Sequence, residues 1–138
     1  MKSLITLLLI AFALPVAADA PDKAAIAVFE SVASAWSSGN AKAIGAHLDK
    51  DTKVSLNLDD SGSYSRDQAI AKLDEYLDSN PTVSLELLEK DGYEGGNNPS
   101  ATYEYEYKDA DGKKRKAQLL VSLRKKGDRW IVAGISRM

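Results

Sequence analysis

The sequence predicts a single α+β domain in which N-terminal helices cover one face of an antiparallel sheet. Apolar residues recur every three or four positions in stretches between residues 22 and 80, as in amphipathic helices. After Pro81 they alternate with polar residues, as in half-buried strands. The 138-residue chain has no internal repeat and no linker that would divide it. Helices followed by hairpin-linked strands are typical of the α+β class.

Residues 1–18 are interpreted as a secretory signal rather than as part of the fold. Lys2 precedes an apolar run over residues 4–14, and small residues follow up to Ala18. The run is too short to cross a bilayer as a helix. We therefore expect a single mature domain over residues 19–138, periplasmic or secreted. A buried N-terminal helix and a retained membrane anchor are the alternatives.

Two helices are predicted at the start of the mature domain. The first spans residues 22–38, where Asp22 caps the first turn and Gly39 ends the last. The second spans residues 41–48 and begins at the capping residue Asn40. Together they form a bent pair with an apolar stripe on one side.

The next part of the chain predicts a strand and a third helix. Residues 53–58 alternate apolar and polar side chains, and residues 59–62 have the composition of a turn. Ser65 and Gln68 have the spacing of a capping box, which opens a helix that stops before Pro81.

Everything after Pro81 predicts an antiparallel meander. Asp111-Gly112 is typical of a tight hairpin, and Gly127-Asp128 is a further turn signal. The alternation of apolar residues between these signals predicts four strands, over residues 82–88, 102–108, 117–125 and 129–137.

Composition and charge exclude several classes of protein. With 18 Lys and Arg against 20 Asp and Glu, the net charge of −2 excludes a strongly basic nucleic-acid binder. The absence of Cys excludes disulfides, thiol nucleophiles and Cys-based zinc sites. The basic run at residues 113–116 is interpreted as a solvated hairpin flank. We expect no nucleic-acid partner, and no membrane attachment once the signal is removed.

Three stretches of the chain resemble an uncharacterised family of small exported bacterial proteins. They are FESVASA at residues 29–35, SGNAKAI at residues 38–44, and YSRDQA at residues 64–69, continuing to Asn80-Pro81. This family is similar to the nuclear transport factor two-like or ketosteroid isomerase-like proteins of the cystatin-like superfamily. The resemblance covers about residues 24–137. It implies a curved antiparallel sheet wrapped around the N-terminal helices, in the order α-α-β-α-β-β-β-β, and it implies no reaction.

Six aromatic residues are the candidate ligand-binding residues. Three of them share one face of the strand over residues 102–108, where their rings could line a concave apolar pocket and their hydroxyls could orient a ligand. Ordinary core packing is the alternative, because tyrosine is a preferred strand residue. The six residues are Tyr103, Tyr105, Tyr107, Trp36, Tyr76 and Trp130.

The strand pattern argues against catalysis of the ketosteroid isomerase kind. The resemblance implies that such members use a pocket carboxylate whose pKa is raised by apolar surroundings. Here the inward strand positions carry Val, Leu, Tyr and Ala, whereas Glu86, Glu104 and Glu106 fall on the opposite face. We expect Glu104 and Glu106 to pair with the cations of residues 113–116. A one-residue bulge would reverse these faces.

The sequence predicts no catalytic residue, no metal site and no cofactor. His47, the only histidine, follows a short helix, where a cation interacts well with the helix dipole. Asp109 and Asp111 with Gly112 resemble the start of a calcium loop, but the cations that follow favour a simple hairpin.

The leading functional hypothesis is a non-catalytic binding module for a small apolar ligand or for a protein partner bound through the sheet. One alternative is a small isomerase, lyase or hydrolase of the ketosteroid isomerase kind, with Tyr103 or Tyr105 as hydrogen-bond donor. Another is a homodimeric scaffold with a filled core, in which the outer face of the sheet forms the interface.

Overall fold

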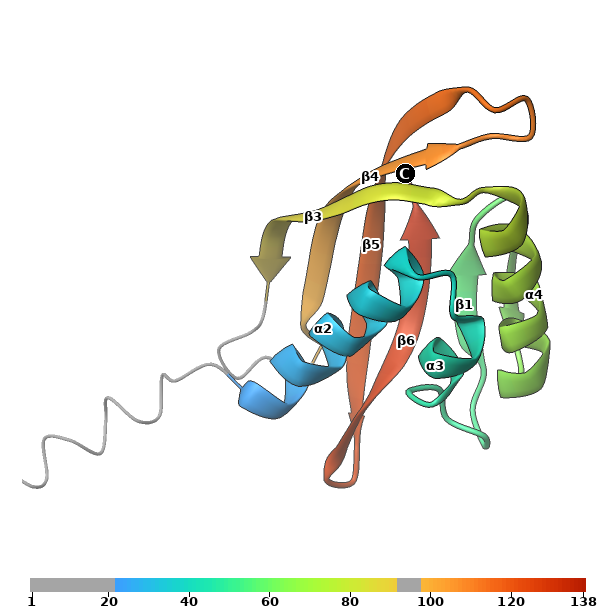
Figure 1. Ribbon diagram of the computed structural model, residues 1–138. Coiled ribbons are helices and arrows are strands. Elements are labelled where there is room, and N and C mark those ends of the chain that lie inside the picture. The colour runs from blue at the N-terminus through green and yellow to red at the C-terminus, as the bar shows by residue number, and fades with distance from the viewer. Residues whose placement is uncertain (1–21, 92–97) are drawn as a thin grey trace, which may run out of the picture.

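The α+β architecture is confirmed by the structure, a computed structural model that describes residues 22–91 and 98–138 (Figure 1). The predicted signal over residues 1–18 lies outside the described residues. Within them, no helix combines the length and the apolar character needed to cross a membrane. In chain order the elements are α2 (Lys23–Ser37), α3 (Ala41–Gly45), β1 (Val54–Asn57), β2 (Ser61–Tyr64), α4 (Arg66–Ser79), β3 (Thr82–Asp91), β4 (Ser100–Lys108), β5 (Lys114–Lys126) and β6 (Arg129–Arg137).

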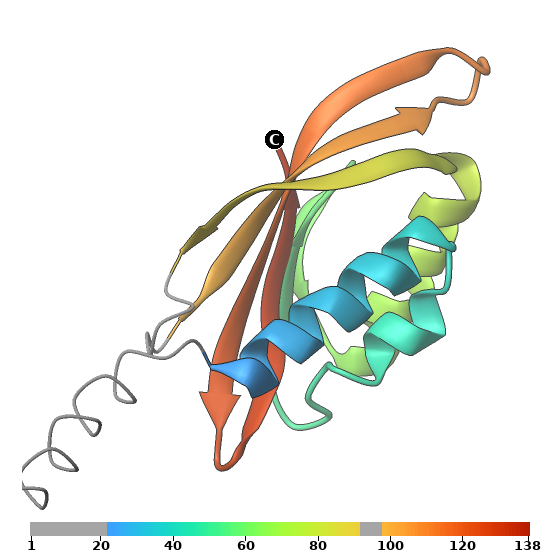
Figure 2. The same ribbon diagram turned by 60° about the vertical axis from the view of Figure 1, so that its left-hand side comes forward.

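The strands form one curved sheet in the order β2-β1-β6-β5-β4-β3, which bends around α2 (Figure 2). The predicted meander of the last four strands is confirmed, since β3 to β6 are antiparallel neighbours. Strand β1, which corresponds to the strand predicted over residues 53–58, joins this meander by pairing in parallel with β6. The predicted turn over residues 59–62 is wrong in its second half. Ser61 and Gly62 belong to β2, which folds back to pair with Asn57 and Leu56 of β1.

Helix α2 lies against the concave side of the sheet because one stripe of it is apolar (Figure 2). Phe29, Val32 and Trp36 on this stripe are at most 1% exposed. The Asp22 side chain accepts two backbone N–H groups of the first turn. Gly39 follows the helix with φ at 70°, a conformation that favours glycine. Both predicted ends of the helix are therefore confirmed.

The two other helices differ in how well they match expectation. Helix α3 ends at Gly45 rather than at Leu48, because glycine is a poor helix former and the chain leaves the helical path there. The Asn40 side chain caps it as predicted. Helix α4 keeps the predicted capping box: Ser65 Oγ accepts the N–H of Gln68, and Gln68 Oε1 accepts the N–H of Ser65.

Strand β4 has the two faces that the sequence predicts. Tyr103 and Tyr105 are buried under the helices, at 5% and 0% exposed. Glu104 and Glu106 lie on the outer face, where Glu104 Oε1 is 3.9 Å from Lys116 Nζ. The register between β4 and β5 is continuous along the whole of β4. The irregularities of the sheet occur in the β3–β4 and β5–β6 pairings, so they do not reverse the faces of β4.

The predicted hairpin between β4 and β5 is confirmed. Gly112 has φ at 77°, and the Asp109 Oδ1 atom accepts the N–H groups of Asp111 and Lys113 at 2.9 and 3.0 Å. Asp109 Oδ2 accepts from Arg115 Nε at 2.8 Å. The carboxylate that resembled a calcium ligand therefore stabilises the turn.

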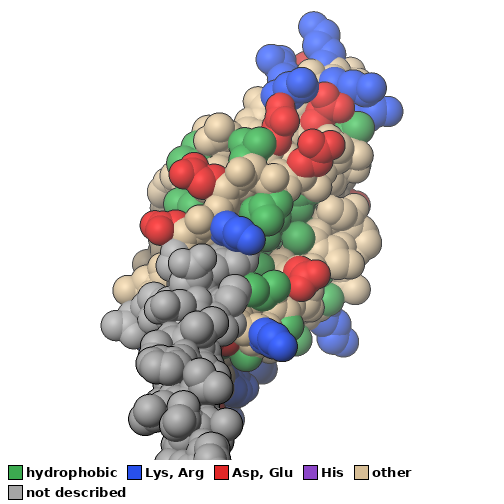
Figure 3. All heavy atoms as spheres, turned by 90° about the vertical axis from the view of Figure 1, so that its left-hand side faces the viewer, with side chains coloured by type: hydrophobic (Ala, Val, Ile, Leu, Met, Phe, Trp, Pro, Cys, Tyr) green, Lys and Arg blue, Asp and Glu red, His purple; other side chains and the backbone are tan. Residues whose placement is uncertain are grey.

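Strand β3 forms one edge of the sheet and exposes apolar side chains. Val83, Leu87 and Leu88 are 42%, 50% and 52% exposed. Figure 3 views the molecule from this side and shows hydrophobic side chains interspersed with acidic ones. Lys and Arg side chains are most concentrated at the upper end, where the β4–β5 hairpin lies, and further ones lie singly in the middle and lower part of the view. Edge strands of natural sheets often carry charges, and here the apolar side chains remain uncovered by the described residues.

Candidate functional site

Four of the six predicted aromatic residues come together between the helices and the sheet. The ring centroids of Trp36 and Tyr76 are 5.8 Å apart, those of Trp36 and Tyr105 5.5 Å, and those of Tyr105 and Tyr107 4.9 Å. These residues come from α2, α4 and β4. Trp36, Tyr76 and Tyr105 are at most 4% exposed, so the rings fill the space that a hollow cone would leave for a ligand.

Arg137 completes this aromatic cluster and was not a sequence candidate. Its Nη1 atom donates to the hydroxyls of Tyr76 and Tyr107 at 3.2 and 3.4 Å. Its Cζ atom lies 5.8 Å from the centroid of each of these rings, within the range of a cation–π interaction. One feature of the sequence could have indicated Arg137: it lies two residues after the buried Ile135 and therefore on the same face of β6.

The hydroxyls of Tyr76 and Tyr105 have raised pKa values and act as neutral hydrogen-bonding groups. Burial, together with the neighbouring Tyr76, raises the pKa of Tyr105 above its ordinary value. Burial also raises the pKa of Tyr76. The Tyr105 hydroxyl donates to the backbone oxygen of Asn80 at 3.4 Å. The Nε1–H of Trp36 is buried and makes no hydrogen bond of good geometry to a described residue, although the Tyr105 hydroxyl lies beside it.

No buried carboxylate accompanies these hydroxyls among the described residues. Asp49 is the one buried acidic side chain of the described chain, and its partners are Lys126 and Thr52. Asp59 reaches the cluster through Arg137 Nη1, at 3.5 Å, and its side chain is 67% exposed. The cluster can therefore donate hydrogen bonds, but it holds no buried acid to move a proton.

The other two aromatic candidates lie apart from the cluster. Trp130 lies at the opposite end of α2 from Trp36, where its Nε1 atom donates to Asp22 Oδ2 at 3.1 Å. Tyr103 is buried two residues along β4 from Tyr105, as part of the hydrophobic core. Both residues belong to the same hydrophobic core as Trp36, Tyr76 and Tyr105.

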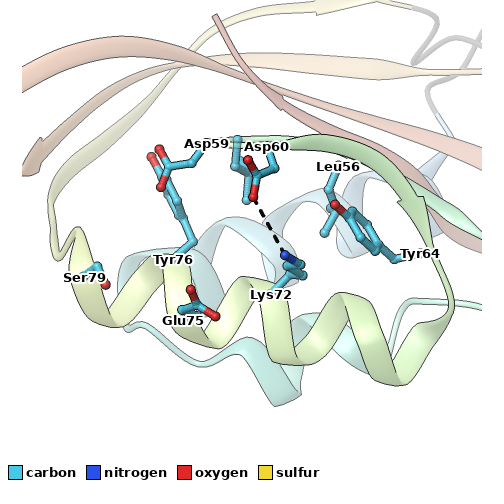
Figure 4. Close-up of a pocket in the computed structure, with 9 residues that line it drawn as sticks. Leu56, Asp59, Asp60, Tyr64, Lys72, Glu75, Tyr76 and Ser79 are labelled. Atoms are coloured by element: carbon cyan, nitrogen blue, oxygen red, sulfur yellow. Dashed lines mark ion pairs between the residues drawn. The ribbon is translucent and has the colours of Figure 1, made fainter.

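A cleft between α4 and the β1–β2 hairpin opens beside the cluster (Figure 4). Its volume is about 70 Å³. Tyr76 belongs to both features, because its ring contacts Trp36 and also lines the cleft. The sequence did not indicate this cleft, because strand β2 was expected to be a turn. The lining residues are Leu56, Leu58, Asp59, Asp60, Tyr64, Lys72, Glu75, Tyr76 and Ser79.

Charged and aromatic groups meet within the cleft. The Lys72 Nζ atom lies 3.9 Å from Asp60 Oδ2 and 5.6 Å from the centroid of the Tyr64 ring. Figure 4 shows Lys72 rising from α4 between Tyr64 on one side and Tyr76 on the other. The cleft thus combines an apolar floor, two tyrosine rings and a charged rim.

His47 lies elsewhere, after α3. Its Nε2 atom is 2.9 Å from Ser31 Oγ on α2. Burial, with a smaller contribution from the charge of Arg129, lowers the pKa of His47 and so favours its neutral form. Across residues 22–91 and 98–138, no group of three or more acidic or histidine side chains is arranged to hold a metal ion.

Comparisons with known proteins identify the family of the chain. The family model described as "Domain of unknown function (DUF4783)" matches residues 29–136. No curated protein matches the chain. A DUF4783 family protein from Bacteroides uniformis has a TM-score of 0.67 and 14% identity, over 78% of this chain and 93% of that one. A DUF4783 family protein from Bacteroides fragilis has a TM-score of 0.63 and 18% identity, over the same shares.

The fold extends beyond that family. A protein from Catenulispora acidiphila with a ketosteroid isomerase-like fold, solved in complex with trimethylamine, has a TM-score of 0.64 and 14% identity. The similarity covers 80% of this chain and 83% of that one. At such identities the likeness concerns the fold alone. The chain therefore belongs to the DUF4783 family, a family of unknown function, and has the nuclear transport factor two-like fold.

Proposed function

We propose that the protein is a non-catalytic binding module and that the cleft beside α4 holds its small ligand. The observation that carries this proposal is the cleft that Tyr76 lines beside the packed aromatic rings. Trp36, Tyr76 and Tyr105 pack against one another where the sequence predicts an aromatic-lined pocket. The cleft is a concave surface next to these rings, and Tyr76 belongs to its lining. A ligand would therefore bind against the outer side of the cluster, through Tyr76.

The composition of the cleft suits a small ligand with an apolar part and a polar part. Leu56 is 2% exposed and, with Leu58, gives the floor its apolar character. Tyr64 and Tyr76 present aromatic rings, and the charged residues lie around them. Ligand sites are commonly apolar surfaces with a few polar groups that fix the orientation of the ligand.

Two further considerations support the binding role. The buried phenols of the cluster have raised pKa values and no buried acid as a partner among the described residues, which favours recognition over proton transfer. The Catenulispora protein was solved with trimethylamine, so a domain with this fold can hold a small organic molecule. If residues 1–18 direct export, as their sequence predicts, the ligand would be met outside the cytoplasm.

The tryptophans allow a direct test. Trp36 contacts Tyr76, which lines the cleft, whereas Trp130 is bonded to Asp22 at the other end of α2. In a Trp130→Phe variant the emission therefore reports the surroundings of Trp36. We expect a saturable change of this emission with at least one member of a panel of small amines, carboxylic acids and neutral aromatics.

The matched control is Trp36→Phe, which keeps only the distant Trp130. A ligand of the cleft should leave its emission unchanged. The same titration followed by NMR should shift the amide signals of α4 and of the β1–β2 hairpin. Absence of any saturable response at millimolar concentrations across the panel would overturn the proposal, as would responses confined to Trp130.

A further inference from the structure

We infer that the cleft selects a small organic cation, of the alkylammonium class, and that Lys72 occupies the position of that cation when the ligand is absent. This inference rests on the proposed function, because it names the chemical class of the ligand for the same cleft. It follows from the charges of the lining, from the aromatic rings and from the weak attachment of Lys72.

The charged residues of the lining are mostly acidic. Asp59, Asp60 and Glu75 line the cleft together with a single cation, Lys72. Asp59 is shared with Arg137, at 3.5 Å, and Asp60 with Lys72, at 3.9 Å. Among the described residues Glu75 makes no ion pair. A cationic ligand would gain from this excess of negative charge, and an anionic ligand would be repelled by it.

Both tyrosines of the cleft already have a cation near the ring. Lys72 Nζ lies 5.6 Å from the centroid of Tyr64, and Arg137 Cζ lies 5.8 Å from the centroid of Tyr76. A cation within about 6 Å of an aromatic centroid is attracted by the negative face of the ring. Both rings thus lie within the distance at which a cation interacts with an aromatic face, and for Tyr64 this cation is Lys72, which itself lines the cleft.

The absence of a side chain at Gly62 leaves room for the Tyr64 ring. A Cβ atom built on Gly62 would lie 3.0 Å from the Tyr64 hydroxyl oxygen and 3.3 Å from its Cε2 atom. The ring therefore lies across β2 at this residue, where Figure 4 shows it facing the side of the cleft that holds Lys72. A preformed ring loses little freedom when a ligand binds to it.

The Lys72 ammonium, which lies near the Tyr64 ring and beside Asp60, is only weakly held there. Its side chain is 45% exposed, and that of its partner Asp60 is 79% exposed. Their separation of 3.9 Å is long for a charge-assisted hydrogen bond, and exposed ion pairs contribute little to stability. A ligand ammonium could therefore replace the Lys72 ammonium over Tyr64 and beside Asp60, with Lys72 swinging into solvent. The volume of about 70 Å³ suits a head group of a few heavy atoms.

The test compares choline with its neutral isostere, 3,3-dimethylbutan-1-ol, by NMR titration of the full domain. The two probes have nearly the same shape and differ in charge. We expect choline to bind at least about fivefold more tightly, because only the charged probe has a charge–charge attraction to the carboxylates and a cation–π attraction to the Tyr64 ring. Equal affinities for the two probes would overturn the inference.

Variants of the cleft make the role of Lys72 specific. Lys72→Met removes the competing ammonium and keeps most of the side-chain stem, so it should tighten choline about threefold or more. Tyr64→Leu should weaken choline by about three- to fivefold. The control is Lys114→Met, which makes the same charge change at an exposed position of β5 and should leave the choline Kd unchanged. An unchanged Kd in Lys72→Met would overturn the inference that Lys72 competes for the site.

The outcomes separate this inference from the proposed function. If 3,3-dimethylbutan-1-ol or another neutral or acidic probe binds at the cleft and choline does not, the cation inference fails and the binding module remains. If no probe of any charge shifts the signals of the cleft, both fail. Circular dichroism spectra of the variants should match the spectrum of the parent protein, because Lys72 and Lys114 are both partly or fully exposed.

Discussion

Asp49 is the residue whose environment departs most from that of an ordinary surface acid. It is 7% exposed, and its two oxygens accept from Lys126 Nζ at 2.9 and 2.8 Å. Thr52 Oγ1 donates to it at 2.9 Å and in turn accepts from Arg124. The hydrogen bond from Lys126 is the largest cause that lowers the pKa of Asp49 to about 2. These bonds attach the loop before β1 to the end of β5.

This lowered pKa predicts a defined loss of stability in acid. As the pH falls, the unfolded chain takes up the Asp49 proton before the folded protein does. The contribution of Asp49 is therefore fully present above the ordinary value of 3.8 and is lost as the pH falls toward 2. In urea unfolding at pH 7, Asp49→Asn should have a lower midpoint concentration of urea than the parent protein. Between pH 4 and pH 2, the midpoint of Asp49→Asn should fall less than the midpoint of the parent protein. Asp51→Asn, at an exposed carboxylate 3.5 Å from the same Lys126 Nζ, is the control. Equal acid sensitivity of Asp49→Asn and the parent protein would contradict the prediction.

Single residues could be predicted from sequence only where they follow the period of their own strand or helix. The alternation of β4 placed Tyr105 on the inner face, and the helical spacing placed Trp36 and Tyr76 on buried faces, as the structure confirms. Arg137 and Asp49 could not be predicted in the same way. Their partners Tyr76 and Lys126 are 61 and 77 residues away along the chain, and the attraction between them exists only once the sheet has formed.

At the scale of elements, α3 and α4 approach each other closely at Gly45. A Cβ atom built on Gly45 would come within 2.6 Å of Ile70 Cγ1 on α4. Gly45→Ala should therefore destabilise the fold by about 1–2 kcal/mol, because overpacking outweighs the better helix propensity of alanine. In an Ile70→Ala background the same change should be neutral, or stabilising by up to about 1 kcal/mol. Denaturant unfolding of the four proteins of this cycle measures the reversal, and an equal cost in both backgrounds would contradict it.

The elements that were predicted well are those with strong local signals. Each of these signals involves side chains within a few positions of one another. The structure confirms the caps at Asp22 and Asn40, the capping box at Ser65 and the hairpin at Gly112. Strand β2 was missed because Ser61 to Tyr64 is polar and short, and its place depends on pairing with β1. The parallel pairing of β1 with β6 joins residues about 79 positions apart, and neither strand carries a mark of its partner. The cleft depends on this pairing and on β2, so it could not be predicted either.

At the scale of the whole molecule, the sequence predicted the class and the side on which the helices lie, but not whether the cone is hollow. Whether a cavity remains depends on whether the side chains of Trp36, Tyr76 and Tyr105 fill the space between α2, α4 and β4. The same convergence ties distant parts of the domain together. Helix α2 lies against the sheet, and β6 pairs with β1. Trp130 on β6 donates a hydrogen bond to Asp22, the residue that caps the start of α2. We therefore expect the described domain to unfold as one unit.

The two tryptophans can measure this cooperativity because they report opposite ends of α2. The helix has 15 residues and thus spans about 20 Å. In Trp130→Phe the urea transition followed by Trp36 emission should coincide with the transition followed by far-ultraviolet circular dichroism, and in Trp36→Phe the same should hold for Trp130. Trp36→Phe should have the lower midpoint, with a loss of about 1–3 kcal/mol, because Trp36 is 0% exposed and contacts two other rings. A Trp130 transition that precedes the loss of secondary structure would show instead that the start of α2 and the β5–β6 turn unfold as a separate unit.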